Sequence, residues 1–299
     1  MRNFGISNWS MKGKYDIHVH SYLDDGGSEM HIKDIVEEAE KKFLDGIGIV
    51  MHYRETVPDV DVYRQMLHGE KNLFALTQLI EEIKEIKRTA SDNLEIKVGI
   101  ETEIKDLEGN LNASQEIIEK VDFVIFVCHW IPEILPYNLT SLILKHKLKA
   151  IEYYRSETWH RIIEDRGRSD LVHRYFGMYK RAMLKFPSAI LGHPHFGDLA
   201  MYKIIEDLED VHEYLLDLAE TMVKTNTTFN ITELMAKVIE NPSIDDCGIG
   251  KNFWNSLPVW INICKEKGVK FLPGSDAHSL ERVGQVDACR RILRGYNRK

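Results

Sequence analysis

The stretch Gly46-Ile-Gly-Ile-Val-Met51, followed at once by His52, shows the pattern on which the fold prediction depends. It is short, apolar and continuous, which is typical of a strand buried on both faces of a parallel sheet. Runs of the same kind recur along the rest of the chain, at Tyr15–Val19, Glu95–Ile100, Asp122–Cys128, Ala189–Gly192, Thr228–Ile231 and Val269–Leu272. Together they predict seven buried strands.

Amphipathic stretches separate these runs, and their apolar residues recur at helical spacing. Four such stripes are Ile35, Ala39 and Phe43; Leu73, Leu76, Ile80, Ile83 and Ile86; Leu171, Tyr175, Tyr179 and Met183; and Val211, Leu215, Leu218 and Met222. Each stripe predicts a helix that packs on the sheet. Alternating strands and helices imply a parallel sheet with crossover helices, and seven strands favour an α/β barrel over an open doubly wound sheet.

Length and composition are consistent with one globular domain over residues 1–299, since a single α/β barrel has this size. No Pro/Gly/Ser-rich linker divides the chain, and the segment 132–167 lacks a clear strand, so we expect a helical insertion there. The net charge of −8 and the absence of a Lys/Arg block disfavour nucleic acid as a partner.

The four cysteines, which are far apart and form no Cys-x-x-Cys pair, predict neither disulfides nor a thiolate zinc site. The polar N-terminus carries no apolar signal region, and no apolar run reaches the length of a membrane span. We therefore expect a cytoplasmic protein without a membrane partner. The oligomeric state is left open by these features.

The positions of the acidic and imidazole side chains indicate the chemistry. Six of the seven predicted strands end in such groups, at Asp16-Ile-His18-Val-His20, His52, Glu101, His129, Gly192-His193-Pro194-His195 and Gly274-Ser-Asp276-Ala-His278. The C-terminal ends of the strands of a parallel barrel share one rim, and that rim carries the active site. The sequence therefore predicts that these groups meet.

Such groups in one place suit divalent cations. Residues two apart on a strand project to the same side, so His18 and His20 could chelate one cation and Asp16 could orient one of their rings. Glu101 follows an apolar strand, and Glu103 competes with it for the same role. A rim of hydrogen-bonded polar residues without metal is the alternative, but so many buried charges need compensation, which cations supply.

The motifs Asp16-Ile-His-Val-His20, His52, Gly99-Ile-Glu101, His129, Gly192-His-Pro194 and Gly274-Ser-Asp-Ala-His278 resemble those of the polymerase and histidinol phosphatase (PHP) superfamily, in order and spacing, over almost the whole chain. The bacterial histidinol-phosphatase branch is the most similar, supported by Asp122-Phe-Val-Ile and by Asp170-Leu-Val-His-Arg-Tyr-Phe. The resemblance implies a distorted, TIM-like (β/α)7 barrel of PHP type with two or three divalent ions, which are zinc, manganese or iron.

The resemblance also implies a ligand set. A first metal would bind His18, His20, Glu101 and Asp276; Glu101 would bridge to a second on His129 and His193; and a third would use His52, His278 and a group after the His-x-His motif. Many members have histidine at this last position. Here Leu23-Asp-Asp-Gly26 resembles the Ser-Asp-Gly variant of other members, and Asp25 is the expected ligand.

The chain departs from the pattern near the substrate. Met51 stands where many members have aspartate, and His195 stands where histidinol phosphatases often have it. The phosphate-gripping arginines of that branch have no clear counterpart after His193. The candidates for this role are Arg54, Arg155, Arg168 and Arg282. We assign Arg54 to it.

The function implied is hydrolysis of a small phosphomonoester, with L-histidinol phosphate as the leading substrate and a metal-bound hydroxide as the nucleophile. Asp276 would orient this hydroxide, and His195 would protonate the leaving group. The alternatives are a PHP-type hydrolase of other scope, acting on nucleotides, phosphotyrosine or amides, and a non-catalytic metal-binding protein. An intact ligand set argues against the last.

Overall fold

The computed structural model describes residues 9, 12–24, 28–56, 69–128, 161, 164, 167–193, 204–205, 208–241 and 251–295. All structural statements below concern these residues. The predicted helical insertion at 132–167 lies almost entirely outside them and remains a prediction.

Seven parallel strands form one sheet in the order of the sequence. The strands are β1 (Tyr15–His20), β2 (Gly46–His52), β3 (Glu95–Glu103), β4 (Phe123–Val127), β5 (Ile190–Leu191), β6 (Thr228–Thr232) and β7 (Lys270–Gly274). Beyond β7, Ala277 bridges Val19 of β1, and the amide of His20 donates to the carbonyl of Ala277 at 2.9 Å. The sheet therefore curls into the predicted (β/α)7 barrel.

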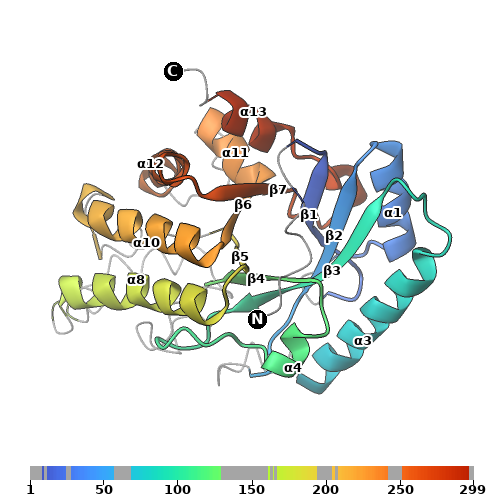
Figure 1. Cartoon of the computed structure of the whole chain (residues 1–299), viewed down its shortest axis with the longest axis horizontal. Helices are drawn as coiled ribbons and strands as arrows, with labels where there is room; N and C mark the ends of the chain where they lie inside the picture. Colours follow the sequence, from blue (N-terminus) through green and yellow to red (C-terminus); the bar gives the residue numbers. More distant parts are fainter. Residues whose placement is uncertain are drawn as a thin grey trace.

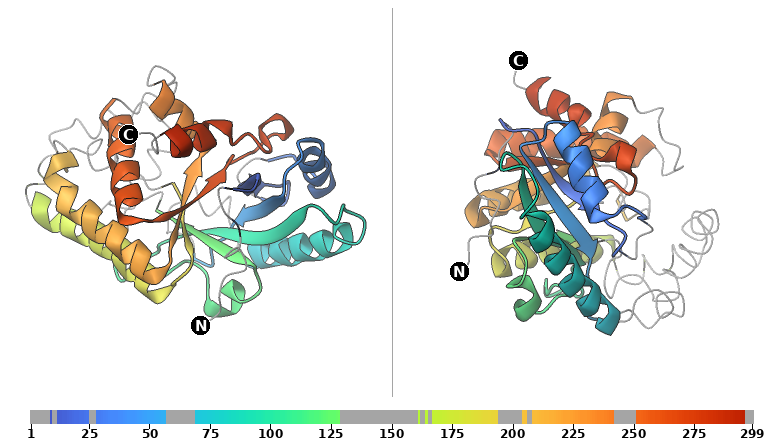
Figure 2. Two further views of the ribbon diagram at one scale, coloured as in Figure 1. Left: turned by 45° about the horizontal axis from the view of Figure 1, so that its top comes forward. Right: turned by 90° about the vertical axis from the view of Figure 1, so that its right-hand side faces the viewer.

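Helices surround the strands (Figures 1 and 2). The α-helices are α1 (Ile32–Lys41), α3 (Gly69–Ile86), α4 (Gln115–Ile118), α8 (Arg168–Lys185), α10 (His212–Thr225), α11 (Glu233–Glu240), α12 (Lys251–Lys267) and α13 (Asp287–Gly295). Two short 3-10 helices, η1 (Leu208–Val211) and η3 (Leu280–Arg282), lie in the connections. In Figure 1, α1 and α3 lie beside β1–β3, whereas α8, α10 and α12 lie on the side of β5–β7.

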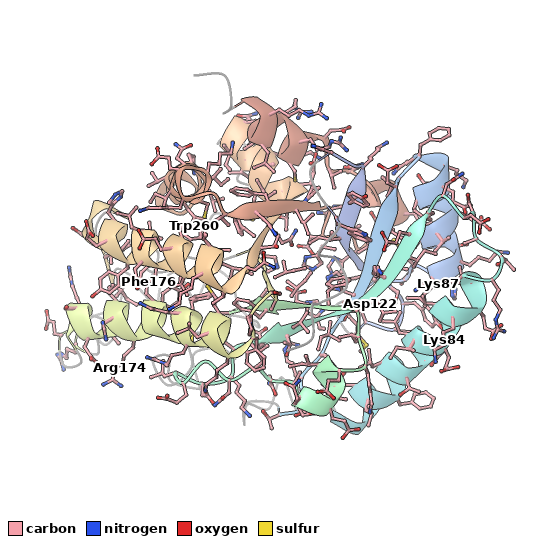
Figure 3. The ribbon with its side chains drawn as sticks, viewed as in Figure 1. Lys84, Lys87, Asp122, Arg174, Phe176 and Trp260 are labelled. Atoms are coloured by element: carbon pink, nitrogen blue, oxygen red, sulfur yellow. The ribbon has the colours of Figure 1, made fainter. Side chains whose placement is uncertain are left out.

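The outer core lies between the sheet and the helices. The predicted stripes of α8 (Leu171, Tyr175, Tyr179, Met183) and of Val211 with α10 (Leu215, Leu218, Met222) are fully buried, as expected. Phe176 of α8 stacks on Tyr214 of α10 with ring centroids 5.3 Å apart, and Figure 3 shows Phe176 between these helices. Trp260 of α12, also labelled there, is buried against Phe229 of β6.

Two expectations for the helix stripes were wrong. Phe43 lies beyond the end of α1, adopts a left-handed φ of 53° and is 85% exposed, because the helix ends before its side chain can reach the sheet. On α3, Leu73 is 40% exposed, and Leu79, which the predicted stripe omits, is buried instead. The rotation of α3 differs slightly from the predicted one.

A second apolar cluster fills the barrel interior below the rim. It consists of Trp9, Ile17, Val50, Phe123, Ile125, Val127, Ile190 and Leu272. The ring of Phe123 lies over Gly48 and Gly99, where a Cβ atom would approach it to 2.8 and 2.4 Å. These two glycines therefore admit the ring that closes the floor under the polar upper half of the barrel.

The helices within the described ranges are all too short or too polar to cross a membrane.

Candidate metal centre

Imidazole and carboxylate side chains converge at the C-terminal ends of the strands. His18 and His20 lie on β1, His52 ends β2, and Glu101 lies on β3. His193 follows β5, and Asp276 and His278 follow β7. The parallel register places His52 directly beside Glu101. The structure brings these groups together at one rim, as the sequence predicts, with the exception of Asp16, whose carboxylate binds backbone amides.

Glu101 is the centre of this group. Its Oε2 lies 3.2 Å from Nε2 of His18, 3.5 Å from Nε2 of His20 and 3.2 Å from Nε2 of His52, and its Oε1 lies 3.1 Å from Nε2 of His193. Burial alone raises the pKa of this carboxyl, but the facing imidazoles of His18 and His52 hold its pKa well below the usual value. Glu101 is therefore ionised and shared by four imidazoles.

Four triads of these side chains could each hold a cation, since the ligand atoms of each triad lie within 4.8 Å of one another. The triads are His18, His20 and Asp276; His18, Glu101 and His193; His20, His52 and Glu101; and His20, Asp24 and His278. The triads share members, so cations bound to them would lie close together.

The Nδ1 atoms of three imidazoles face hydrogen-bond acceptors. Nδ1 of His18 lies 2.9 Å from Oδ1 of Asn230, whose Nδ2 donates to the carbonyl of Leu272. Nδ1 of His20 lies 2.7 Å from Oδ2 of Asp24, and Nδ1 of His52 lies 2.9 Å from the same carboxylate. The hydrogen bonds of His18 and His52 fix which nitrogen of each of these two rings carries hydrogen, and all three contacts leave the Nε2 atoms facing Glu101.

The resulting geometry fits cations. Nε2 of His18 and Nε2 of His20 lie 3.0 Å apart, and as neutral rings both would direct lone pairs at each other and at Glu101. Such a cluster needs a proton or a metal ion at its centre. Burial lowers the pKa of His18, but Glu101 and Asp276 outweigh it and raise that pKa to about 9. Without metal, protons thus occupy a site built for cations.

Asp24 is a member of the site that the sequence analysis missed. It is buried, accepts from the backbone amide of His52 at 2.9 Å, and contacts His20, His52 and, at 4.0 Å, His278. The expected ligand Asp25 lies outside the described residues and stays a prediction. The adjacent pair Asp24-Asp25 was the available signal, but strand alternation does not choose between two residues of a turn.

Asp16 does not orient an imidazole, contrary to expectation. The register of β1 and β2 shifts between Asp16 and Val19, so the strand alternation is broken there. The Asp16 carboxylate accepts from the amides of Ser275 at 2.8 Å and Gly284 at 2.7 Å. It therefore fixes the segment after β7, from which Asp276 and His278 project.

Asp276 adopts a left-handed φ of 53°, a conformation that aspartate tolerates better than most residues. Its Oδ1 lies 3.6 Å from Nε2 of His18 and 3.4 Å from Nε2 of His20. Burial raises the pKa of Asp276, but the nearby imidazoles lower it by more. The net effect is a lowered pKa, so the carboxyl is ionised. With 30% of the side chain exposed, Asp276 lies between the cluster and the solvent.

Arg54 and Glu103 form a buried ion pair near the centre. Nη2 of Arg54 lies 3.1 Å from Oε1 of Glu103, and the two residues follow His52 and Glu101 by two positions each. Glu101 contacts the imidazoles of His18 and His52, whereas its competitor Glu103 pairs with Arg54. The other two predicted site residues, His129 and His195, lie outside the described residues.

The comparisons with known proteins agree with the fold. No protein-family model matches the sequence, and no curated protein does. Among solved structures, histidinol phosphate phosphatase (HISK) from Lactococcus lactis, complexed with zinc, L-histidinol and phosphate, matches with a TM-score of 0.56 and 17% identity over 95% of this chain and 93% of its own. A Listeria monocytogenes protein assigned as histidinol phosphatase hisK matches with a TM-score of 0.59 and 14% identity over 91% and 97%. The chain thus has the barrel fold of these histidinol phosphatase structures, as the motif resemblance predicted.

Proposed function

We propose that the chain is a metal-dependent phosphomonoesterase of the PHP superfamily and that L-histidinol phosphate is its leading substrate. One observation carries the proposal: the single buried carboxylate of Glu101 lies between 3.1 and 3.5 Å from four imidazoles. A buried carboxylate that faces so many nitrogen ligands is suited to bridge cations.

Two or three zinc, manganese or iron ions would bind here. His18, His20, Glu101 and Asp276 would hold the first, Glu101 and His193 with His129 the second, and His52 and His278 the third, with Asp24 or Asp25. Cations bound there would supply Lewis acidity, which lowers the pKa of bound water and neutralises charge on a phosphoryl group.

The chain's own residues would bind and orient the reactants. Ionised Asp276, which is partly exposed on the solvent side of the cluster, accepts a hydrogen bond from the attacking water and orients it. Arg54, held by Glu103, presents a guanidinium to phosphate oxygens. His195 donates a proton to the leaving oxygen, because imidazole titrates near neutral pH.

The substrate class rests on two supports. The centre contains four overlapping triads of possible metal ligands, and the Lactococcus lactis structure of the same fold contains zinc, L-histidinol and phosphate. A nucleotide phosphoesterase, a phosphotyrosine phosphatase and an amidohydrolase are the alternatives within the same metal chemistry.

The test is a panel of substrates with purified protein loaded with zinc, manganese or iron. It contains histidinol phosphate, sugar phosphates, mononucleotides and phosphotyrosine, beside amides and lactones. We expect phosphate release that is greatest with histidinol phosphate and that is abolished by chelation. Turnover of mononucleotides far above histidinol phosphate would exclude the branch, and amide or lactone turnover without phosphate release would exclude the reaction class.

A further inference from the structure

The strand β6 contributes to the candidate centre through an amide. It is the one predicted strand that does not end in a metal-competent group, yet its Asn230 is fully buried in the barrel interior. Oδ1 of Asn230 lies 2.9 Å from Nδ1 of His18. Two residues that are 212 positions apart in the sequence thereby meet beside the cluster.

We propose that Asn230 is a positioning residue that holds His18 with its Nε2 atom directed at the cations. The amide is itself fixed, because its Nδ2 donates to the backbone carbonyl of Leu272 on the neighbouring strand. Its oxygen is therefore the atom that faces the imidazole, and His18 donates its Nδ1 hydrogen to it. Rotation of the His18 ring would break this hydrogen bond.

Gly274 of β7 supports the same arrangement. A Cβ atom at this position would lie 2.7 Å from Nδ2 of Asn230 and 2.7 Å from Cβ of His18. Any larger residue would have to displace the amide, the histidine or both. The space left by Gly274 thus allows Asn230 and His18 to approach each other.

The side chain that faces Nδ1 of His18 is neutral, whereas the one that faces Nδ1 of His20 and of His52 is negatively charged. His20 and His52 share the anionic carboxylate of Asp24, whereas His18 has a neutral amide. A carboxylate partner raises the basicity of a ligating imidazole more than an amide does. Asn230 therefore orients His18 without adding a further negative charge to a cluster that already contains Asp24, Glu101 and Asp276.

This inference rests on the proposed metal centre, and zinc binding tests the two separately. Wild type, Asn230→Leu, Asn230→Asp and Asn112→Leu are stripped of metal, and their zinc affinity is measured by competition with a chelating dye. Asn112→Leu is the matched control, because Asn112 is a buried asparagine that bonds to the backbone of Glu55 and Thr56 and, among the residues that the structure describes, to no imidazole. Thermal unfolding of each metal-free variant reports on its folding.

We expect Asn230→Leu to weaken zinc binding by about 10- to 100-fold. Asn230→Asp keeps an acceptor oxygen for His18 but loses the Nδ2 donor to Leu272, so it should bind zinc more tightly than Asn230→Leu does. Asn112→Leu should bind zinc as wild type does. Equal zinc affinity of Asn230→Leu and wild type, or equal losses in Asn230→Leu and Asn112→Leu, would overturn the role. If Asn230→Leu does not fold, Asn230→Ala, treated in the same way, takes its place because it also lacks the acceptor: a zinc affinity equal to that of wild type overturns the proposal. A wild-type chain that binds no zinc would overturn the metal centre as well.

Discussion

Nε2 of His18 and Nε2 of His20 face each other at 3.0 Å, while the Nδ1 atoms of both rings face acceptors. Neither ring can satisfy the other as a neutral imidazole, so the metal-free cluster binds protons. The raised pKa values of His18 and His52 follow from this arrangement, because the ionised carboxylates of Glu101, Asp276 and Asp24 surround them. Metals and protons therefore compete for the same nitrogen atoms.

The first prediction is that zinc binding releases protons. At pH 8, below the pKa of about 9 that His18 has in the metal-free protein, we expect about one proton or more to leave per chain on loading. Calorimetric titration in two buffers of different ionisation enthalpy measures this number. His18→Gln should release fewer protons. Stoichiometric zinc binding without proton release would contradict the account of the cluster.

The second prediction concerns the stability of the metal-free protein. The pKa of His18 rises from 6.5 to about 9 on folding, so the folded state binds more protons than the unfolded state between these values. This stabilisation is complete below pH 6.5 and is lost as the pH rises through about 9. We expect the free energy of unfolding to fall by on the order of 1–3 kcal/mol across this range.

Urea unfolding at several pH values measures this slope. The zinc-loaded protein is the control, because bound metal replaces the protons and should flatten the dependence. A metal-free protein that becomes more stable between pH 6.5 and 9 would show that His18 is not the proton-binding group.

The third prediction separates two neighbouring carboxylates. Glu101→Gln removes the charge that four imidazoles share, so we expect loss of most activity and of about one metal equivalent, with the fold retained. Glu103→Gln removes the partner of Arg54 and should raise KM while the metal content is unchanged. Elemental analysis and steady-state kinetics of both variants give the answer. Metal loss in Glu103→Gln alone would reverse the assignment.

The strands could be predicted because each is a short apolar run. The predicted run Gly46–Met51 differs from β2 by one residue at its end, and the run Thr228–Ile231 differs from β6 likewise. The rim could be predicted because parallel strands direct their C-terminal ends to one side. The spacing of apolar residues does not indicate where a helix ends. The prediction that Phe43 packs on the sheet was therefore wrong, because α1 ends at Lys41.

The residues that orient the imidazoles could not be predicted from the sequence. Asn230 is not a common metal ligand, and its contact with His18 depends on how β6 and β1 approach across the barrel. Asp16 was assigned to this task by strand alternation, but the irregularity between Asp16 and Val19 turns it toward backbone amides. Ligands follow from residue type and strand position, whereas their supporting partners follow from three-dimensional proximity.

The fourth prediction concerns the floor of the barrel. A Cβ atom at Gly99 would lie 2.4 Å from the ring of Phe123, which cannot move because it is fully buried. We expect Gly99→Ala to lower the free energy of unfolding by about 1–3 kcal/mol. Adding Phe123→Leu should recover part of this loss. Gly177→Ala on α8 is the control, because a Cβ atom there would lie no nearer than 3.1 Å to any neighbouring atom, the nearest being Nη1 of Arg181. It should not lower the free energy of unfolding, and a loss equal to that of Gly99→Ala would refute the steric explanation.

The fifth prediction identifies the aspartate of the β1–α1 turn. Asp24 is buried and its carboxylate lies 2.7 Å from Nδ1 of His20 and 2.9 Å from Nδ1 of His52. Burial raises the pKa of this carboxyl, but His20 and His52 hold it well below its usual value. Asp24→Asn preserves the shape of the side chain but removes the negative charge that faces both rings. We expect the variant to lose the third cation and to bind the others about 10- to 100-fold more weakly.

Asp25→Asn is the matched control for that experiment, because it changes the neighbouring carboxylate by the same chemistry. If Asp24 alone supports the third cation, Asp25→Asn should keep the metal content and activity of wild type. If Asp25 is the ligand, as the motif resemblance implies, its variant loses one cation, while Asp24→Asn weakens all sites through the imidazoles that it orients. Loss of metal from Asp25→Asn with none from Asp24→Asn would refute a role for Asp24 in the centre. Counting zinc per chain by elemental analysis, before and after dialysis against a weak chelator, distinguishes the three results.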